Sequence, residues 1–348
     1  MRIAAAAAVS IALLSGTAIE AKENARLTRI DADTVELTRT DAAPATIWLS
    51  HDTLLDKGDA KVGSKSTADR IRIALPSNQR GYVIVREGKD RTTIVAERLL
   101  PLEQGSNFRD IGGYVTRDGH TVRWGKVFRS GAMPLLSDAD YALVGQLGID
   151  SVVDLRSLEE RSLAADEVDD RTGALFISND YSIRSVFAGA QSMAGENVYQ
   201  GMETLLVPQY RSLYRRILAG EGAVLYHCSA GQDRTGIATA LLYDMLGVDR
   251  QTIVSDYHLS TAWRQPKWEM PDLDPADHPD NPLLQHYASR AASERRQPEP
   301  LYSKSGQSHL VQFFAYLDEK YGGSEAYMKN VLGFTDDEIG KLRTTMLE

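Results

Sequence analysis

The sequence lacks several features that mark common classes of protein. Its 348 residues include a single cysteine, Cys228, so no disulfide can form within the chain. It has no run of the roughly 20 apolar residues that a membrane-spanning helix needs, so no stable membrane anchor is expected. No histidine pair has metal-ligand spacing, and no glycine-rich nucleotide loop appears. Neither a metal ion nor an organic cofactor is therefore expected.

The chain has fewer basic than acidic residues. Its formal net charge is −9 at pH 7, and acidic residues are spread over both halves. The resulting field repels nucleic acid and anionic membrane surfaces, so neither is an expected partner, and a phosphate-bearing substrate must be captured by a local site. The hydrophobic content of 43% and charged content of 25% are typical of globular proteins. The length allows two packed domains, whereas nothing in the sequence indicates the oligomeric state.

Residues 1–21 have the organisation of an export signal. Arg2 supplies a positive charge, residues 3–14 form an apolar run rich in alanine, and small residues end at Ala18 or Ala21. This pattern predicts a cleaved signal peptide, so we expect the mature protein to be periplasmic or secreted. An uncleaved segment that lies in the membrane interface is the alternative.

Residues 26–100 contain short runs in which apolar and polar residues alternate, separated by Gly, Asp, Asn and Pro. Such runs occur at residues 46–49, 70–73 and 82–85. Alternation with a period of two indicates half-buried strands, and no helical period competes with it. We therefore predict a small antiparallel β-sandwich domain over residues 22–100, in which nothing looks catalytic.

After Pro101 the pattern changes to strands that alternate with helices. Residues 151–155 and 223–226 are apolar runs typical of buried central strands. Apolar residues recur at helical spacing from Ser137 to Leu147 and from His309 to Tyr321, and residues 335–338 open a last helix. This alternation predicts an α/β domain over residues 101–348.

Two further segments of this domain lack a clear pattern. Seven of the twelve prolines lie between Arg264 and Gly306, so this stretch is expected to be irregular. It is either a flap over a site or a surface loop. The segment from Tyr181 to Tyr210 can act as a lid that restricts access to a site.

The residues with recognisable chemistry lie in one segment, 224–236. Apolar strand residues lead into a short loop from His227 to Thr235, and an apolar helix follows. The backbone N–H groups of such a loop turn inward at the helix N-terminus, where the partial positive charge favours an anion. Cys228 begins this loop, and the same charge favours its thiolate, which is the nucleophilic form. Arg234 can bind two oxygens of a phosphoryl group through its planar side chain.

Three of these residues also have ordinary structural interpretations. By residue type alone Cys228 would be a buried core side chain, but its neighbours favour the catalytic interpretation. His227 either tunes the thiolate and holds the loop or is a buried histidine bound by the backbone. Thr235 either donates its hydroxyl to the sulfur or caps the following helix.

The loop sequence His-Cys-x5-Arg-Thr-Gly resembles the signature of the protein tyrosine phosphatase superfamily. Three further blocks, at residues 107–114, 124–131 and 154–157, resemble its branch of bacterial tyrosine and dual-specificity phosphatases, which includes a secreted mycobacterial enzyme. The resemblance runs from about Leu102 to Gly247 and is expected to continue to the C-terminus, and the N-terminal sandwich lies outside it. It implies a phosphatase domain with a central sheet flanked by helices, and cysteine-dependent hydrolysis of phosphate monoesters.

The resemblance also implies roles for individual residues. It places the general acid at Asp233, immediately before Arg234. Asp180 is the alternative, because other branches use an aspartate from a mobile loop. The implied catalytic residues are Cys228, Asp233 and Arg234, and the implied phosphate-binding residues are Ser229, Ala230, Gly231, Gln232, Thr235, Arg109 and Asp110.

Buried charges are expected to support this site. Arg129 and Arg156 are interpreted as partners of buried carboxylates such as Asp154, and His227 and Arg156 as supporting residues. Gln232 departs from the family pattern, which usually has lysine at this position. The missing cation, together with the acidic chain, disfavours highly anionic substrates.

These inferences predict an exported, cysteine-dependent protein tyrosine phosphatase. They do not decide whether it also acts on phosphoserine and phosphothreonine. The leading substrate is a phosphotyrosine-containing protein, or a small phosphate monoester, hydrolysed through a thiophosphoryl-cysteine intermediate. One alternative is a phosphoinositide or inositol polyphosphate phosphatase. Another is a module that binds phosphate without catalysis.

Overall fold

The computed structural model describes residues 23, 25–40, 43–89, 91–184, 197–289, 297–298 and 300–348. The predicted signal peptide, residues 1–21, lies outside the described residues. Within the described ranges, no helix combines the length and the apolar character needed to cross a membrane.

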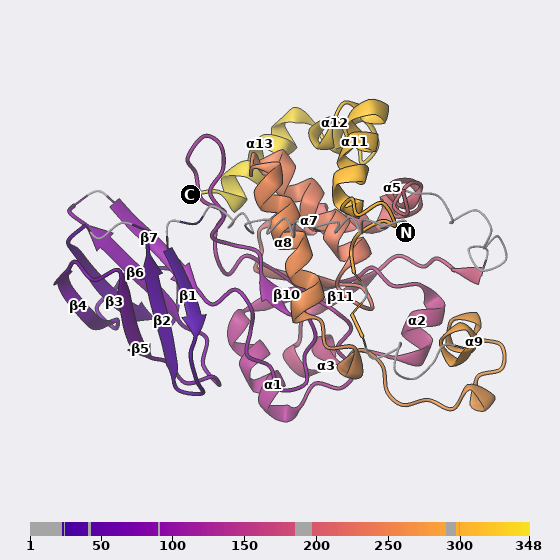
Figure 1. Cartoon of the computed structure of the whole chain (residues 1–348), viewed down its shortest axis with the longest axis horizontal. Helices are drawn as coiled ribbons and strands as arrows, with labels where there is room; N and C mark the ends of the chain where they lie inside the picture. Colours follow the sequence, from indigo (N-terminus) through magenta and orange to yellow (C-terminus); the bar gives the residue numbers. More distant parts are fainter. Residues whose placement is uncertain are drawn as a thin grey trace, which may run out of the picture.

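The N-terminal part consists of two antiparallel sheets, drawn in indigo and purple in Figure 1. Its strands are β1 (Ala25–Arg29), β2 (Thr34–Arg39), β3 (Ala45–Ser50), β4 (Ala60–Ser66), β5 (Arg70–Ala74), β6 (Tyr82–Glu87) and β7 (Arg91–Ala96). One sheet has the order β1-β2-β5 and the other the order β4-β3-β6-β7. The predicted antiparallel β region is thereby confirmed.

The core of this part lies between the two sheets. Along β2, buried and less buried residues alternate, so that Val35 and Leu37 point inward. They pack with Ile47 of β3 and with Val83 and Val85 of β6 in one apolar cluster. This alternation follows from the period of two in a strand, which places successive side chains on opposite faces.

The second part is built on a five-stranded sheet with the order β11-β10-β12-β9-β8. Its strands are β8 (Arg109–Asp110), β9 (Val127–Ser130), β10 (Ile149–Asp154), β11 (Leu175–Ser178) and β12 (Ala223–His227). The neighbouring strands from β11 to β9 are parallel, and β8 joins the edge antiparallel to β9. The two predicted central strands correspond to β10 and β12.

Helices cover both faces of this sheet (Figure 1). They are α1 (Asp138–Val144), α2 (Leu158–Leu163), α3 (Val168–Thr172), α5 (Met202–Leu205), α6 (Val207–Ala219), α7 (Asp233–Leu246), α8 (Arg250–Trp263), α9 (Pro282–Ser289), α11 (His309–Tyr321), α12 (Ser324–Asn330) and α13 (Asp336–Met346). Three short 3-10 turns are η1 (Gly145–Leu147), η2 (Pro266–Trp268) and η3 (Pro275–Asp277). Leu225 of β12 packs in the cluster that contains α1 and α3 residues, whereas Val224 and Tyr226 pack in the cluster of α6, α7 and α11.

The helix ends agree with the expected signals, with one difference. Ser137 caps α1 in a capping box, but the last turn before Gly148 tightens into η1. Gly322, in the left-handed region, ends α11, and Thr335 caps α13. Glycine suits such a C-terminal position because it adopts positive φ without steric cost.

A buried ion pair joins the two parts. Arg80 lies between β5 and β6, and its Nη2 donates to Oδ2 of Asp110 in β8 at 2.6 Å. Both side chains are buried, with relative exposures of 5% and 0%. Arg98 adds a second contact, because its guanidinium lies over the ring of Tyr114 at 3.8 Å. The antiparallel sheets are therefore docked against the sheet that carries the functional loop.

Candidate active site

The loop from Cys228 to Gln232 connects β12 to α7 at the carboxyl end of the parallel sheet. Its shape requires glycine at Gly231, where φ is +64° and an added Cβ would lie 2.5 Å from the Ser130 carbonyl oxygen. The Cys228 side chain is buried at the start of the loop. The predicted order of strand, loop and helix is therefore observed.

Donors from neighbouring segments bind the loop carbonyls from outside. Asn107 Nδ2 donates to the Gly231 carbonyl at 2.9 Å, and Arg129 Nη2 donates to the same oxygen at 2.6 Å. The Ala132 amide donates to the Ser229 carbonyl at 2.9 Å. With these carbonyls bound by outside donors, we expect the loop amides to face an anion at the start of α7.

Arg234 is held in a fixed orientation by Glu160 of α2. Nη1 of Arg234 donates to Oε2 of Glu160 at 2.6 Å, and Nη2 donates to Oε1 at 2.5 Å. The Tyr181 hydroxyl accepts a further bond from Nη1 at 2.8 Å. Burial alone would raise the pKa of Glu160, but Arg234 and the hydroxyl of Ser229 hold that pKa well below its usual range. The arginine fork is therefore positioned before any substrate binds.

Sequence reasoning missed Glu160, although a local signal was present. Ser157 caps α2 and forms a capping box with Glu160, which is the spacing Ser-x-x-Glu. Read alone, this spacing indicates only a helix start. The same carboxylate accepts from the Ser229 hydroxyl at 2.5 Å, so the side chain of Ser229 serves the loop framework.

Asp233, the expected general acid, is the first residue of α7 and is partly exposed. Its Oδ1 accepts a hydrogen bond from the Tyr199 hydroxyl at 2.6 Å, and Tyr199 also contacts the Tyr257 hydroxyl. Burial, followed by the charge of Asp233, raises the pKa of Tyr199 well above its usual value. Tyr199 thus stays a hydrogen-bond donor to the carboxylate. The alternative acid, Asp180, has an exposed side chain that pairs with Arg161.

His227 belongs to a cluster of charged and polar side chains under the loop, in which His227 and Asp154 are fully buried. Its Nε2 lies 3.2 Å from Asp166 Oδ2 and 3.8 Å from Asp154 Oδ1, and its Nδ1 lies 3.3 Å from the Cys228 carbonyl oxygen. Arg156 donates to both carboxylates, with Nη2 at 2.8 Å from Asp154 and 2.9 Å from Asp166. Arg156 thus contacts Asp154 as expected, and the supporting role of His227 stays a prediction.

The same cluster brings together ligand types that metals favour. Asp154, Asp166 and His227 each offer one ligand atom, and these three atoms lie within 4.8 Å of one another. The guanidinium of Arg156 already supplies a positive charge and hydrogen bonds to both carboxylates. The set therefore fits an ion-pair network better than a cation site.

The structure does not bring Arg109 and Asp110 to the phosphate position, which corrects that expectation. Arg109 is fully buried behind the loop, where it donates to Asn107, to the carboxylate of Asp256 and, at 3.1 Å, to the Ser260 hydroxyl. The Asp110 carboxylate is bound by the backbone amides of residues 112 and 125 and by Arg80. Because internal partners occupy both groups, Arg109 acts on the loop through Asn107, and Asp110 acts at the junction between the two parts.

The remaining loop side chains have distinct surroundings. The Thr235 hydroxyl is buried and finds no hydrogen-bond partner among the described residues. Gln232, and not Thr235, is the residue at the N-cap of α7, so the capping interpretation of Thr235 is not supported. Gln232 Oε1 accepts from Arg264 Nη1 at 2.6 Å, and Arg264 also forms a two-point pair with Glu269. A positive charge therefore does stand beside Gln232, although Glu269 neutralises it.

The proline-rich segment contributes a helix that lies against the site. Asn281 Nδ2, just before α9, donates to the Glu159 carbonyl in α2 at 3.0 Å. Burial, followed by the charge of Glu160, raises the pKa of Tyr287 in α9, and Arg264 opposes this effect. This helix therefore accounts for part of the stretch that the sequence left open between a flap and a loop. In the other expected lid, residues 185–196 lie outside the described residues.

The arrangement brings a cysteine, a two-point anion binder and a carboxyl group together where β12 leads into α7. This combination can transfer a phosphoryl group to sulfur and then to water. No single one of these groups would specify that chemistry. Their common position at the start of α7 does.

Comparison with known proteins agrees with this geometry. A model of the tyrosine phosphatase family matches residues 100–348. The chain is 30% identical to a tyrosine-protein phosphatase of Nostoc commune over 225 residues. The matched region covers 63% of this chain and 73% of that protein. The chain is also 30% identical over 188 residues to the triple specificity protein phosphatase PtpB of Mycobacterium tuberculosis, which covers 43% of this chain and 65% of that protein.

Proposed function

Because the chain belongs to the tyrosine phosphatase family and is a phosphoric monoester hydrolase, we propose that it hydrolyses phosphotyrosine through Cys228. The observation that carries this proposal is the pair between Arg234 and Glu160, which fixes the arginine fork beside the loop that begins with the cysteine. A preoriented fork can bind two oxygens of the transferring group without reorganisation during the reaction.

The reaction proceeds in two displacements. The Cys228 thiolate attacks phosphorus and forms a sulfur–phosphorus bond, while the bond from phosphorus to the tyrosyl oxygen breaks and Asp233 gives its proton to that oxygen. Asp233 then takes a proton from a water molecule, which attacks phosphorus, and the sulfur–phosphorus bond breaks. Inorganic phosphate leaves and the thiolate is restored. The loop amides and Arg234 carry the negative charge of the transferring group throughout.

Tyr199 and Thr235 lie close in sequence or space to the catalytic residues and support them. Tyr199 donates to Asp233, whereas the buried Thr235 hydroxyl has no hydrogen-bond partner among the described residues. We assign to Thr235 a hydrogen bond to the Cys228 sulfur as it leaves the thiophosphoryl intermediate. This bond stabilises the thiolate that the second step releases.

Aromatic side chains beside Arg234 favour an aryl phosphate. The Tyr181 hydroxyl accepts a hydrogen bond from Arg234, and Tyr287 belongs to α9, which packs against the helix that carries Glu160. Such walls suit the ring of a phosphotyrosine residue. The positive charge of Arg264, close to Gln232, is neutralised by Glu269, so a second phosphate gains little there.

The proposed site of action is outside the cytoplasm. The basis is residues 1–21, in which a positive Arg2 precedes an apolar run and small residues. Under this proposal the substrates are phosphoproteins or small phosphate esters met after export.

A substrate panel with a nucleophile control tests the proposal. Purified enzyme and Cys228→Ser are compared on a phosphotyrosine peptide, on the same peptide with phosphoserine or phosphothreonine, and on phosphatidylinositol phosphate vesicles. We expect the highest kcat/KM on phosphotyrosine and no measurable turnover by Cys228→Ser, because a hydroxyl is scarcely ionised at neutral pH. Higher kcat/KM on the vesicles would replace the proposed substrate, and activity of Cys228→Ser within about tenfold of wild type would remove the thiolate mechanism.

A further inference from the structure

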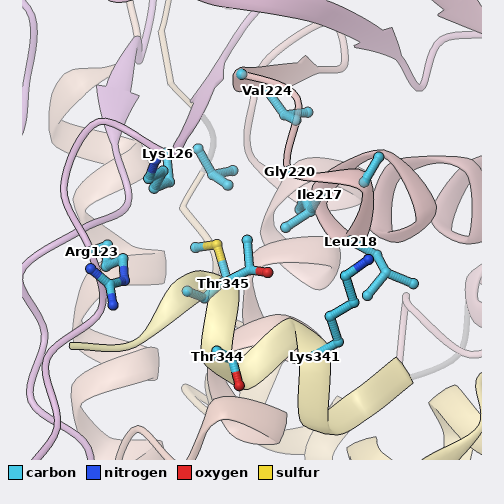
Figure 2. A pocket seen from close by; sticks show the side chains of 13 residues that line it. Arg123, Lys126, Ile217, Leu218, Gly220, Val224, Lys341, Thr344 and Thr345 are labelled. Carbon is cyan, nitrogen blue, oxygen red and sulfur yellow. The ribbon is translucent and has the colours of Figure 1, made fainter. Parts of the chain in front are cut away.

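A second pocket lies at the opposite end of the sheet from the loop. It has a volume of about 370 Å³ and is shown in Figure 2. Val127, the first residue of β9, and Val224, near the start of β12, line it. Cys228 follows Val224 by four residues, which corresponds to roughly 13 Å of extended strand. A ligand in this pocket therefore does not touch the catalytic loop.

The floor of this pocket is formed by apolar side chains that expose little of their own surface. Val127 and Val224 of the sheet, Ile217 and Leu218 of α6 and Met346 of α13 are all buried and line it. Burial of a hydrocarbon group against such side chains gains roughly 25 cal/mol for each Å² of apolar surface removed from water. The floor thus suits an aromatic ring or a short aliphatic chain.

The rim of the pocket is positive. Arg123 and Lys126 lie on one side and Lys341 on the other (Figure 2), and none of the residues that line the pocket is acidic. Lys126 and Lys341 form no ion pair with the described residues, and Arg123 Nη1 lies 3.6 Å from the Glu348 carboxylate. The convergence of three cations stands out in a chain with a net charge of −9. Their mutual repulsion is relieved when an anion binds among them.

The pocket is held open by backbone hydrogen bonds. The Arg123 amide donates to the Met346 carbonyl at 2.7 Å. Thr121 and Glu348 exchange two backbone bonds, at 2.8 Å and 3.0 Å. These bonds tie the end of α13 to the segment that carries Arg123, so little ordering is needed when a ligand enters.

We propose that this pocket binds a small organic anion with an apolar body. Its carboxylate or phosphate group lies between Arg123, Lys126 and Lys341, and its hydrocarbon part covers the floor. The pocket volume is within the range of small-molecule sites in proteins. The site is separate from the catalytic loop, so its occupancy is independent of the proposed substrate.

Calorimetric titration of the full chain with naphthalene-1-sulfonate tests this proposal. Orthovanadate is present at a concentration that abolishes phosphatase activity, so that the catalytic loop is already occupied. We expect binding under these conditions, and binding at least about tenfold weaker for the uncharged analogue 1-naphthalenemethanol. Loss of sulfonate binding when vanadate is present would place the probe in the catalytic loop and overturn the proposal.

Paired variants assign the binding to the rim. Lys126→Gln with Lys341→Gln removes two cations, and we expect about a tenfold rise in Kd with unchanged kcat/KM and Tm. The matched control, Lys57→Gln with Lys304→Gln, removes two exposed lysines elsewhere and should leave Kd unchanged. An unchanged Kd in the first pair, or equal changes in both pairs, would show that general surface charge and not this pocket binds the probe.

Discussion

Arg234 and Glu160, which lie 74 residues apart in the sequence, form a two-point hydrogen-bonded pair beside Cys228. The pair links the catalytic loop to α2, and Ser157 in turn holds the carboxylate through the capping box. One helix start therefore has two uses, since it satisfies backbone donors of α2 and orients the phosphate-binding arginine. The catalytic loop is complete only when both segments are in place.

Glu160→Gln tests this relationship. The amide keeps the shape of the side chain but loses the charge, so it cannot accept both guanidinium bonds with the same strength. We expect kcat/KM on a phosphotyrosine peptide to fall by roughly 10- to 100-fold, as small misplacements of a binding group do. Glu325→Gln, which weakens a surface pair with Arg343, is the control and should change kcat/KM by less than about twofold. Equal effects of the two variants would count against a positioning role for Glu160.

The same variant has a defined pH dependence of stability. Arg234 lowers the pKa of Glu160 in the folded protein, so the pair contributes stability above the unfolded pKa of about 4.3. That contribution decreases as the pH falls below this value toward the folded pKa. We expect the difference in Tm between wild type and Glu160→Gln to be largest at pH 6–8 and to shrink below about pH 4. A difference that grows on acidification contradicts the assignment.

The junction between the two parts depends on a buried pair, Arg80 and Asp110. Burial is the largest influence on Asp110 and raises its pKa, which Arg80 opposes. Arg80→Met leaves the carboxylate uncompensated, and we expect a loss of about 3–5 kcal/mol in the free energy of unfolding at pH 7. The ionised Asp110 carboxylate is penalised in the folded protein only at pH values above its unfolded pKa of about 3.9. The loss of stability in the variant should therefore decrease as the pH falls toward 4.

The control for this prediction neutralises the second partner. Arg80→Met combined with Asp110→Asn removes the buried charge, so part of the lost stability should return in urea unfolding at pH 7. If the double variant is less stable than Arg80→Met by the full effect of the second substitution, the two residues are not coupled.

Export gives a direct mass prediction. The mature protein should begin just after Ala18 or Ala21 and be found outside the cytoplasm, with the Cys228 thiol reactive toward alkylating agents. Intact-mass analysis of the extracytoplasmic fraction, before and after iodoacetamide, measures both properties. A soluble cytoplasmic form that retains Met1 would contradict the signal-peptide interpretation.

Local patterns in the sequence were sufficient for the fold class and for the order of strand, loop and helix around Cys228. The loop was predicted because Cys228, Gly231 and Arg234 lie within seven residues, so their spacing alone specifies the strand, the turn and the helix start. β10 and β12 were predicted because strands buried on both faces read as continuous apolar runs. Export and the domain boundaries stay predictions.

Partners that are distant in the sequence could not be predicted in this way. The bond from Tyr199 to Asp233 joins residues 34 positions apart, and no local pattern relates them. Asp110 was misplaced because its role was carried over from the resemblance of its block to bacterial phosphatases, whereas its partner Arg80 comes from the preceding β region. The sequence also could not show that a cation stands beside Gln232, because Arg264 reaches this residue from the end of α8. Such contacts depend on how elements pack, which a single sequence does not encode locally.

Asp233 is the residue at which the catalytic and structural interpretations differ most. As general acid it protonates the leaving oxygen, so Asp233→Asn should lower kcat/KM on a phosphotyrosine peptide by roughly 10²- to 10⁴-fold. An activated aryl phosphate, such as p-nitrophenyl phosphate, has a leaving oxygen that needs little protonation, and its rate should fall much less. If Asp233 served only the start of α7, asparagine would replace it with little cost and both substrates would change together by a small factor.

The ratio of kcat/KM for the two substrates separates these interpretations, and Asp180→Asn provides the matched comparison. The Asp180 side chain is exposed and pairs with Arg161, so we expect its variant to keep the wild-type ratio. Tyr199→Phe removes the hydrogen bond to Asp233 and should change the ratio in the same direction as Asp233→Asn, by a smaller factor. A changed ratio in Asp180→Asn together with an unchanged ratio in Asp233→Asn would move the general acid to Asp180, because the leaving-group dependence follows the residue that supplies the proton.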